Sequence, residues 1–312
     1  YFSMGMDIAD VDNDGHDDIY TTDMMPEDEY RLRTTSAFDG WDVYQAKLRN
    51  DYGHQFMRNM LQRNNGDGTF SDIGQLAGVA RTDWSWSALL TDLDQDGRKD
   101  IFVTNGLLRD VTSQEYLAFV ANTETAKQVT SGQKVDFMAL TKAMSTTPIS
   151  DYAFRNDGGM RFSNQAKAWG LDEPNISSGA SYADLDGDGA LDLIVNNANL
   201  EAFVFRNNVR ALTPANRYLR VRLEGSGMNR FAIGARVTMY AGTDQYTQEL
   251  SPTRGFQSSV EYPLTFGVGT HATIDSLVVV WPDGTESRQQ AVTTNATVSY
   301  THLRAHETGR NL

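Results

Sequence analysis

The strongest constraint on the fold is an acidic pattern, D-x-D-x-D-G-x-x-D, that occurs three times along the chain. Its copies begin at Asp10, Asp92 and Asp184. Each copy follows a run of small and apolar residues and precedes a short run of β-forming residues, such as Ile101-Phe102-Val103 after the second copy. Each acidic segment is therefore expected to be a loop that joins two strands.

A second element recurs between the loops and sets the length of the repeat. Arg63-Asn64 and Arg155-Asn156 each stand 29 residues before the next acidic loop, and Arg206-Asn207 stands 22 residues after the start of the third loop. Asn-Gly and Asp-Gly pairs close behind the first two copies are the chemistry of hairpin turns. The uninterrupted repeat is then about 51 residues with about four strands, which predicts a blade of a β-propeller. We expect the three arginines to bond a neighbouring loop.

Two stretches that interrupt the repeat, residues 26–60 and 107–148, are rich in Glu, Gln, Lys, Ala and Leu. Helical spacing between Tyr116 and Val120 indicates helices in the second stretch. We interpret both as helical inserts on one face of a propeller. Residues 1–212 then hold about three blades, fewer than the minimum of about four for a closed ring, and we expect preceding sequence to supply the rest.

The repeat stops near Pro214, and a second all-β region follows. A Pro-Asp-Gly-Thr turn at residues 282–285 closes a hairpin there. We expect residues 216–300 to form a small β-sandwich-like domain, and we interpret residues 301–312 as a non-native or disordered tail. The fold class is therefore all-β, a partial β-propeller followed by a small sandwich. The predicted strands are Tyr218–Leu223, Ala235–Tyr240, Tyr246–Leu250, Pro263–Phe266 and Ile274–Trp281.

The acidic loops carry the donor set of a calcium site. Calcium prefers about six to eight oxygen ligands from carboxylates, carbonyls and water. In each loop, positions 1, 3, 5 and 9 supply carboxylates, Gly at position 6 permits the bend, and position 7 offers a backbone carbonyl. We therefore expect about three calcium ions in a structural role. The predicted ligands are Asp10, Asp12, Asp14, His16 and Asp18; Asp92, Asp94, Asp96, Arg98 and Asp100; and Asp184, Asp186, Asp188, Ala190 and Asp192.

The loops are not EF-hands, because that site needs a Glu at position 12 between two helices. Position 12 here is Thr21, Val103 or Val195, each within a predicted strand. An exposed polar turn without a cation is the alternative interpretation. Four carboxylates in one small loop repel each other when no cation is present, and the threefold recurrence favours calcium.

The loops resemble the FG-GAP repeats of integrin α-subunit propellers, in the VCBS-type version of bacterial surface proteins. Four C-terminal motifs resemble the ASPIC/UnbV domain: NRFAIGARV at 229–237, GFQSS at 255–259, FGVG at 266–269 and VWPDG at 280–284. Together the two regions are similar to the cartilage acidic protein family and its bacterial relatives over about residues 1–300. The resemblance implies a secreted or surface-exposed calcium-binding propeller, joined to a domain with no assigned chemistry.

Composition narrows the functional classes. With 41 Asp+Glu against 27 Lys+Arg, the chain has a net charge of −14 and lacks the basic character of a nucleic-acid-binding protein. It has no cysteine, and no apolar run approaches the ~18 residues of a membrane span. There is no G-x-S-x-G, H-E-x-x-H or phosphate-loop motif. We therefore expect a protein that is not an enzyme.

The leading interpretation is a calcium-stabilised adhesion or scaffold module, extracellular or at the cell surface, with a signal peptide in preceding sequence. A protein or glycan ligand would bind its propeller face. One alternative is an accessory glycan-binding part of a polysaccharide-processing surface system, in which Trp41, Trp84 or Trp86 contacts sugar. For Trp84 and Trp86, core packing is favoured over sugar contact. The other alternative is part of a larger enzyme whose active site lies elsewhere.

Overall fold

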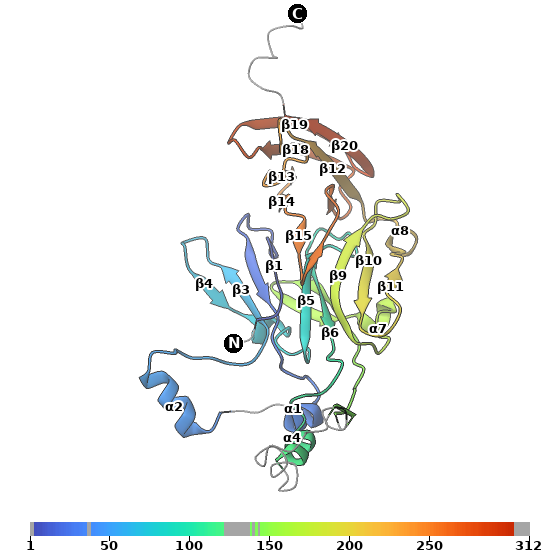
Figure 1. Cartoon of the computed structure of the whole chain (residues 1–312). Helices are drawn as coiled ribbons and strands as arrows, with labels where there is room; N and C mark the ends of the chain where they lie inside the picture. The colour runs from blue at the N-terminus through green and yellow to red at the C-terminus, as the bar shows by residue number, and fades with distance from the viewer. Residues whose placement is uncertain (1–2, 36–38, 122–137, 139–140, 143, 303–312) are drawn as a thin grey trace, which may run out of the picture.

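The computed structural model describes residues 3–35, 39–121, 138, 141–142 and 144–302. These residues form mainly antiparallel sheets with few helices, which confirms the all-β class. Figure 1 shows the N-terminal sheets in a propeller-like arrangement, with the C-terminal sheets at one end of them. Within the described ranges, no helix combines the length and the apolar character that a membrane crossing requires.

Each N-terminal sheet is a meander in which consecutive strands pair antiparallel. The first sheet has the order β1-β2-β3-β4, the second β5-β6-β7-β8 and the third β11-β10-β9. The first strands β1, β5 and β9 contact one another in this order, so the three sheets follow each other in space as they do along the chain. The strands are β1 Met6–Ala9, β2 Asp18–Thr21, β3 Met60–Asn64, β4 Phe70–Asp72, β5 Ser85–Thr91, β6 Asp100–Asn105, β7 Tyr152–Gly158, β8 Arg161–Asn164, β9 Ser177–Ala183, β10 Asp192–Asn197 and β11 Phe203–Phe205.

The acidic loops connect the first two strands of each sheet, as the sequence pattern predicts. Asp18, Asp100 and Asp192, at loop position 9, are each the first residue of the strand that leaves the loop. Each pairs with the last residue of the strand that enters it. All three loops therefore lie at the same end of their sheets.

Neighbouring N-terminal sheets pack face to face through apolar side chains. Tyr20 and Leu61 of the first sheet belong to one core cluster with Phe154 of the second. The opposite face of the second sheet packs through Phe102 against residues of the third sheet, such as Leu193. The second sheet is thus covered on both faces, because it lies between the other two.

Helices occur in both stretches that interrupt the repeat. Residues 26–60 contain two described helices. Residues 107–148 contain one, which ends at Val120, and most of residues 122–143 lie outside the described part of the chain. Arg31 connects the inserts to the sheets, because its guanidinium bonds Asp83 at 2.6 Å and Asp110 at 3.4 Å. The insert helices are α1 Glu29–Thr35, α2 Trp41–Arg49 and α4 Gln114–Val120, and one-turn helices follow β4, β8 and β11 as α3 Gly74–Ala77, α7 Ala166–Trp169 and α8 Val209–Leu212.

The C-terminal region contains two larger sheets, with orders β17-β12-β20 and β14-β13-β18-β19, and the hairpin β15-β16. Strands β12 and β20 pair in parallel, whereas the other pairs are antiparallel. One core cluster takes side chains from both larger sheets, including Leu219 and Phe266 from one and Met239 and Leu277 from the other. The strands are β12 Tyr218–Glu224, β13 Arg236–Ala241, β14 Asp244–Glu249, β15 Thr253–Arg254, β16 Ser258–Ser259, β17 Leu264–Gly267, β18 Thr273–Val280, β19 Glu286–Thr293 and β20 Ala296–Thr301.

The five predicted C-terminal strands correspond to β12, β13, β14, β17 and β18, with bounds that agree within about two residues. The sequence pattern predicts no bounds for β19 and β20. Thr301 ends β20, and the His302 N–H donates to the Glu224 carbonyl at 2.8 Å. These first two residues of the predicted tail therefore belong to the fold, and residues 303–312 lie outside the described part of the chain.

Candidate metal centres

The first aspartate of each acidic loop closes the turn. The Asp10 carboxylate accepts hydrogen bonds from the N–H groups of Asp14 and Gly15, at 3.0 and 2.9 Å. Asp92 and Asp184 likewise accept from the glycine at position 6 and from one earlier N–H of their loops. Position 6 has a φ of 89°, 97° and 90° in the three copies, a left-handed conformation that only glycine adopts readily.

The ninth aspartate joins the loop to the third strand of its sheet. Asp18 accepts from the Val11 N–H at 3.0 Å and from the Asn64 N–H at 2.8 Å. Asp100 and Asp192 make the equivalent pairs of bonds in their sheets. The recurring Arg-Asn motif therefore supplies, through the asparagine N–H, one fixed partner of each loop.

The carboxylates converge in each loop. In three groups of three aspartates, one oxygen of each member lies within 4.8 Å of those of the other two. Such a spacing allows one cation to bind oxygens from all three. The groups are Asp10, Asp12 and Asp18; Asp92, Asp94 and Asp96; and Asp184, Asp186 and Asp192.

The remaining predicted ligands lie in the same loops but outside these groups. They are Asp14, Asp100 and Asp188, and the position-7 residues His16, Arg98 and Ala190. The N–H of each position-7 residue donates to the carboxylate at position 5, at 2.9, 2.9 and 2.8 Å. That bond fixes the end of the loop, and metal binding by the position-7 carbonyl stays a prediction.

Burial and repulsion between charges oppose ionisation of several carboxylates in the first two loops. Burial is the main cause that raises the pKa of Asp92 to about 8; repulsion from Asp94 and Asp96 adds to it, and the charge of Lys99 opposes it. Burial likewise raises the pKa values of Asp94, Asp10 and Asp18 to about 6. A divalent cation would favour the ionised forms and compensate the repulsion.

Two of the three recurring arginines bond the acidic loop of their own sheet. Arg63 bonds Asp12 at 2.8 Å, and Arg206 bonds Asp186 at 2.7 Å. Both aspartates stand at loop position 3. Arg155 instead bonds Asp157 in its own hairpin, so the expected loop contact forms in two sheets of the three.

Side-chain amides connect successive loops, which the sequence analysis missed. The Asn13 amide donates to the Gly97 carbonyl at 2.9 Å, and the Gln95 amide donates to the Gly189 carbonyl at 2.7 Å. Each donor is at position 4 of its loop, and each acceptor is at position 6 of the next. The only sequence signal is an amide residue at position 4, where φ is 59° and 58°.

The asparagines of the Arg-Asn motif also connect neighbouring sheets. The Asn156 side chain donates to the carbonyl of Lys99 in its own loop and to that of Val11 in the first loop, at 3.1 and 3.0 Å. Asn207 bonds carbonyls of the third and second loops in the same way. The three loops therefore form one hydrogen-bonded row.

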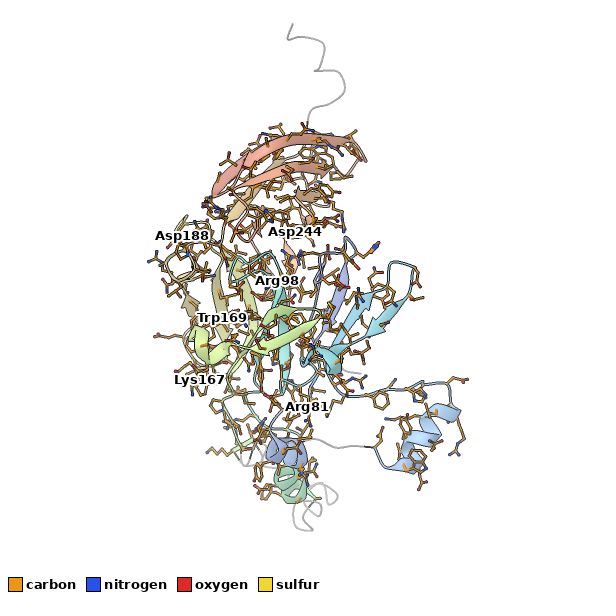
Figure 2. All side chains as sticks on the ribbon, turned by 180° about the vertical axis from the view of Figure 1, so that it is seen from behind. Arg81, Arg98, Lys167, Trp169, Asp188 and Asp244 are labelled. Carbon is orange, nitrogen blue, oxygen red and sulfur yellow. The ribbon has the colours of Figure 1, made fainter. Side chains whose placement is uncertain are left out.

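The C-terminal region lies against this row. Arg220 bonds Asp184 of the third loop at 2.5 Å and also bonds Glu261, and Arg236 bonds Asp17 of the first loop at 2.6 Å. In Figure 2, Arg98 and Asp188 of the second and third loops lie at the end of the sheets that faces the C-terminal region. The candidate metal centres are thus at the boundary between the two regions.

The glycines at position 6 also allow this close approach. A Cβ on Gly97 would lie 2.8 Å from the Tyr246 ring, and one on Gly189 would lie 2.0 Å from the Tyr218 ring. In the second and third loops, position 6 therefore has two constraints, the left-handed turn and the aromatic ring packed on it. In the first loop the Gln245 side chain lies in the place of the ring.

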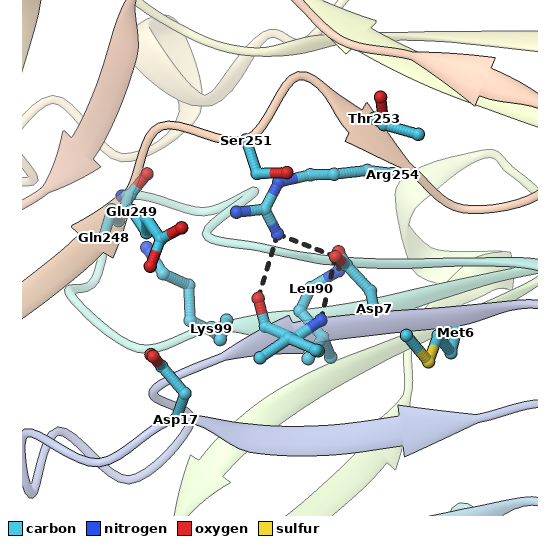
Figure 3. A pocket seen from close by; sticks show the side chains of 12 residues that line it. Met6, Asp7, Asp17, Leu90, Lys99, Gln248, Glu249, Ser251, Thr253 and Arg254 are labelled. Carbon is cyan, nitrogen blue, oxygen red and sulfur yellow. Dashed lines mark hydrogen bonds and ion pairs between the residues drawn. The ribbon is translucent and has the colours of Figure 1, made fainter. Parts of the chain in front are cut away.

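A cavity of about 400 Å³ lies at the same boundary, next to β1 (Figure 3). Arg254 reaches across it to the Asp7 carboxylate at 2.7 Å, and Asp7 also accepts from the Leu90 N–H at 2.7 Å. Lys99 lines the cavity with its ammonium 5.7 Å from the centre of the Phe266 ring. A buried ion pair therefore joins the two regions here.

The tryptophans differ in their surroundings. Trp86 donates from Nε1 to the Gly106 carbonyl at 2.6 Å, and its ring centre is 4.9 Å from that of Phe256. Trp84 is half-buried just before β5, whereas Trp41 at the start of α2 is 72% exposed. These contacts favour packing for Trp86 and leave Trp41 available to a ligand.

Comparison with known proteins matches both regions. The FG-GAP-like repeat family matches residues 40–103, which include the second acidic loop, and the ASPIC and UnbV family matches residues 225–307. Cartilage acidic protein 1 of Xenopus tropicalis is 26% identical over 254 residues, which are 72% of this chain and 38% of that protein. The human protein of the same name is 26% identical over 251 residues, 72% of this chain and 37% of that protein.

The chain thus spans less than two fifths of the length of these relatives. Their similarity agrees with the resemblance inferred from the acidic loops and the C-terminal motifs. A propeller-like region with a match to the FG-GAP-like repeat is thus followed by a region with a match to the ASPIC and UnbV family, and the chain is similar to cartilage acidic protein 1.

Proposed function

We propose that the protein is a non-enzymatic, calcium-binding adhesion or scaffold module of the extracellular type. The observation that carries this proposal is the convergence of three carboxylates in each of three equivalent loops. Oxygen donors at this density suit calcium. About three calcium ions would bind, one in each loop.

Calcium in this position would stabilise the arrangement of the sheets. The loops are bonded to one another and lie against the C-terminal region, so a cation that fixes one loop also fixes its contacts. We interpret the three N-terminal sheets as propeller blades with helical inserts and the C-terminal sheets as a small sandwich. The proposed domain division is 1–212 for the blades and 216–300 for the ASPIC/UnbV domain.

The proposed compartment is the cell exterior or surface. Loops of a few carboxylates bind calcium with dissociation constants of about 10⁻⁴–10⁻³ M in extracellular modules. Such sites fill only where calcium is near millimolar. Fractionation of the source cells with an antibody to this chain tests the compartment, and an entirely cytosolic pool would contradict it.

Titration calorimetry tests the calcium proposal directly. Calcium is added to chelator-treated protein, with magnesium as the control, and about three sites of millimolar or submillimolar affinity are expected. The melting temperature should rise over the same concentrations. Absence of both heat and thermal shift at several millimolar calcium would overturn the proposal.

A second candidate function is glycan binding, and one aromatic cluster favours it. Trp41 and Tyr44 of α2 have ring centres 5.8 Å apart, and His54 and Phe56 stack at 6.3 Å beside Tyr44. Aromatic rings exposed in a group are suited to stack on sugar faces or on a protein partner. Glycan-array binding by the intact chain and by Trp41→Ala separates this candidate from a scaffold that binds only protein.

A further inference from the structure

The hairpin between β3 and β4 has an Asn-Gly pair at its tip. Asn65 and Gly66 are both exposed, and Gly66 has a φ of 73°. Figure 1 shows this hairpin at the outer margin of the propeller-like region. Asp157, the equivalent of Asn65 in the second sheet, is also exposed, although that sheet is covered on both faces. The tip of such a hairpin is therefore open to water whether or not another sheet packs beside it.

An asparagine followed by glycine is prone to spontaneous deamidation, because glycine has no side chain to hinder the reaction. The backbone nitrogen of the glycine attacks the carbon of the asparagine side-chain amide and loses its proton, a C–N bond forms, and ammonia leaves. Water then opens the cyclic imide at either carbonyl, so that the products are aspartate and isoaspartate. The reaction needs only water, and it converts a neutral amide into a carboxylate.

The contacts of Asn65 leave its amide at the surface. The Nδ2 atom donates to Thr69 Oγ1 at 2.9 Å and to Ser71 Oγ at 3.0 Å. The Gly66 N–H donates to the side-chain oxygen of Asn64 at 3.0 Å. Thr69 and Ser71 are themselves exposed, so water competes for these hydrogen bonds and can reach the reacting atoms.

The chain contains one other Asn-Gly pair, Asn105-Gly106, and the fold encloses it. The buried Asn105 side chain accepts from Ser85 Oγ at 2.7 Å, and the Gly106 N–H donates to the Trp84 carbonyl at 2.9 Å. A Cβ on Gly106 would lie 2.7 Å from the Ile176 backbone. The two pairs therefore have the same chemistry and opposite exposure.

The second sheet shows what a carboxylate does at this hairpin position. Arg155 donates to the Asp157 carboxylate from Nε and Nη2, at 2.8 and 2.6 Å. The two turns agree in their backbone, because the following glycine N–H donates to the preceding asparagine side chain at 3.0 Å in both. In the first sheet, where the position holds an amide, Arg63 bonds Asp12 of the acidic loop at 2.8 Å. The side chain at this position thus selects the partner of the arginine.

The surroundings of Asn65 already suit a carboxylate. A hydrogen bond from Ser163 and the charge of Arg155 hold the pKa of Asp157 below its usual range. Ser71 of the first hairpin occupies the place of Ser163, since each pairs with the arginine of its sheet. A carboxylate at position 65 would therefore have the same hydroxyl and the same kind of guanidinium within reach.

We propose that Asn65 is a site of spontaneous deamidation, and that the aspartate product draws Arg63 away from Asp12 and frees the first acidic loop for a cation. Asp12 is one of the three aspartates that converge in this loop. Its second carboxylate oxygen is buried and has no hydrogen-bond partner among the described residues. Arg63 and a cation compete for Asp12, so departure of the arginine raises the affinity of the loop. The modification is independent of calcium, and its effect on the loop rests on the proposed function.

Peptide mapping of the intact chain, after incubation at mildly alkaline pH, tests the modification. Asn65 should convert to aspartate and isoaspartate. The Asn105 amide should survive at least about tenfold longer, because its site has to open before the reaction can occur. In urea the two pairs should convert at similar rates, which makes Asn105 the matched control. An Asn65 amide as long-lived in the folded chain as that of Asn105 would overturn the proposal.

The variant Asn65→Asp tests the effect of the aspartate product. Its crystal structure in chelator should place the Arg63 guanidinium on the new carboxylate and away from Asp12. Calcium should bind one site up to about fivefold more tightly than in the original protein, as the strength of an exposed ion pair allows. In an Arg63→Met background, Asn65→Asp should leave the calcium affinity unchanged, because no guanidinium remains to move.

Two results with this variant would overturn the proposal. One is a structure in which Arg63 still bonds Asp12. The other is a gain in calcium affinity that persists in the Arg63→Met background, because the added charge alone would then cause it. Absence of calcium binding to the original protein and to every variant would refute the proposed function and the effect on the loop, whereas peptide mapping and the chelator structure would still decide the modification and the movement of Arg63.

Discussion

The side-chain amide of Gln95 donates to the backbone carbonyl of Gly189 at 2.7 Å, although 94 residues separate them in the chain. The same side chain accepts from Arg210 at 3.1 Å through its amide oxygen. Gln95 is buried, so its removal leaves the Gly189 carbonyl without this donor, whereas Arg210 keeps its bond to the Asn216 carbonyl at 2.8 Å. The contact joins the second acidic loop to the third and thereby fixes the separation of two candidate metal centres.

Gln95→Ala is expected to lower the free energy of unfolding by about 1–3 kcal/mol, because the Gly189 carbonyl loses its donor and alanine has to adopt the left-handed φ of 58°. Denaturant melts with the calcium concentration held constant measure the change. The matched control is Asn199→Ala, at an exposed residue with the same φ of 58°, which carries the cost of alanine in the left-handed conformation without the buried hydrogen bond. The control should lower the free energy of unfolding by less than Gln95→Ala does.

Asp94→Asn is expected to reduce the stabilisation by calcium. At a calcium concentration ten times the dissociation constant, a single site adds about 1.4 kcal/mol to the free energy of unfolding. The variant should lose the contribution of the site in the second loop. In chelator its melting temperature should equal or exceed that of the original protein, because one repelling charge is removed. Asp67→Asn, in an exposed hairpin turn, is the control. Identical calcium dependence of both variants and the original would contradict a metal centre in this loop.

Stability is expected to depend on pH through Asp151. Burial raises the pKa of this carboxyl from 3.8 to about 6, against hydrogen bonds from Ser177, the Asn105 N–H and Asn175. The folded state therefore holds a proton that the unfolded state has released between pH 4 and 6. The free energy of unfolding falls as pH rises through this window, by up to about 3 kcal/mol.

Asp151→Asn should remove the part of the pH dependence of stability that is due to Asp151. The free energies of unfolding from denaturant melts at pH 4.5 and at pH 7 measure this change. The amide replaces a carboxyl that is already neutral at the lower pH, so the two proteins should be similar there and diverge at pH 7. Asp172→Asn, outside this buried cluster, is the control. Parallel profiles for Asp151→Asn and the original protein would show that Asp151 ionises normally.

Arg220→Met is expected to destabilise the chelator-treated protein by about 3–5 kcal/mol, because the Asp184 and Glu261 carboxylates then lose the guanidinium between them. Calcium should restore part of this loss, since a cation in the third loop also neutralises Asp184. Arg222→Met, on an exposed position of the same strand, is the control. Equal destabilisation of Arg220→Met with and without calcium would show that the role of Arg220 is independent of a metal centre in the third loop.

The sequence predicts the acidic loops and most strands because their determinants are local. Aspartates at alternating positions and a glycine at position 6 define each turn, and short β-forming runs flank it. The Arg-Asn motif is also recognisable from its spacing, although its physical role is not. Its asparagine N–H bonds the ninth aspartate, a contact that depends on strand pairing across 15 to 56 residues.

The contacts between regions have no local signal. Arg254 pairs with Asp7 across 247 residues, and no pattern near either residue distinguishes that arginine from others on the surface. Arg155 has the same motif as Arg63 but turns to Asp157, which occupies a position where the first hairpin has Asn65. One substitution in a hairpin thus redirects a side chain that the repeat alone would assign to the loop.

At the boundary between the propeller-like region and the C-terminal sheets, ion pairs form between arginines of the C-terminal region, Arg220, Arg236 and Arg254, and aspartates of the propeller-like region. Each region has its own apolar core, but each would contain buried or half-buried charges without a partner if the other region were removed. The two regions should consequently unfold together, and calorimetry should show one thermal transition instead of two. A shortened chain that ends near residue 212 would keep its core and still lose stability, because three aspartates, Asp7, Asp17 and Asp184, would lack their arginines.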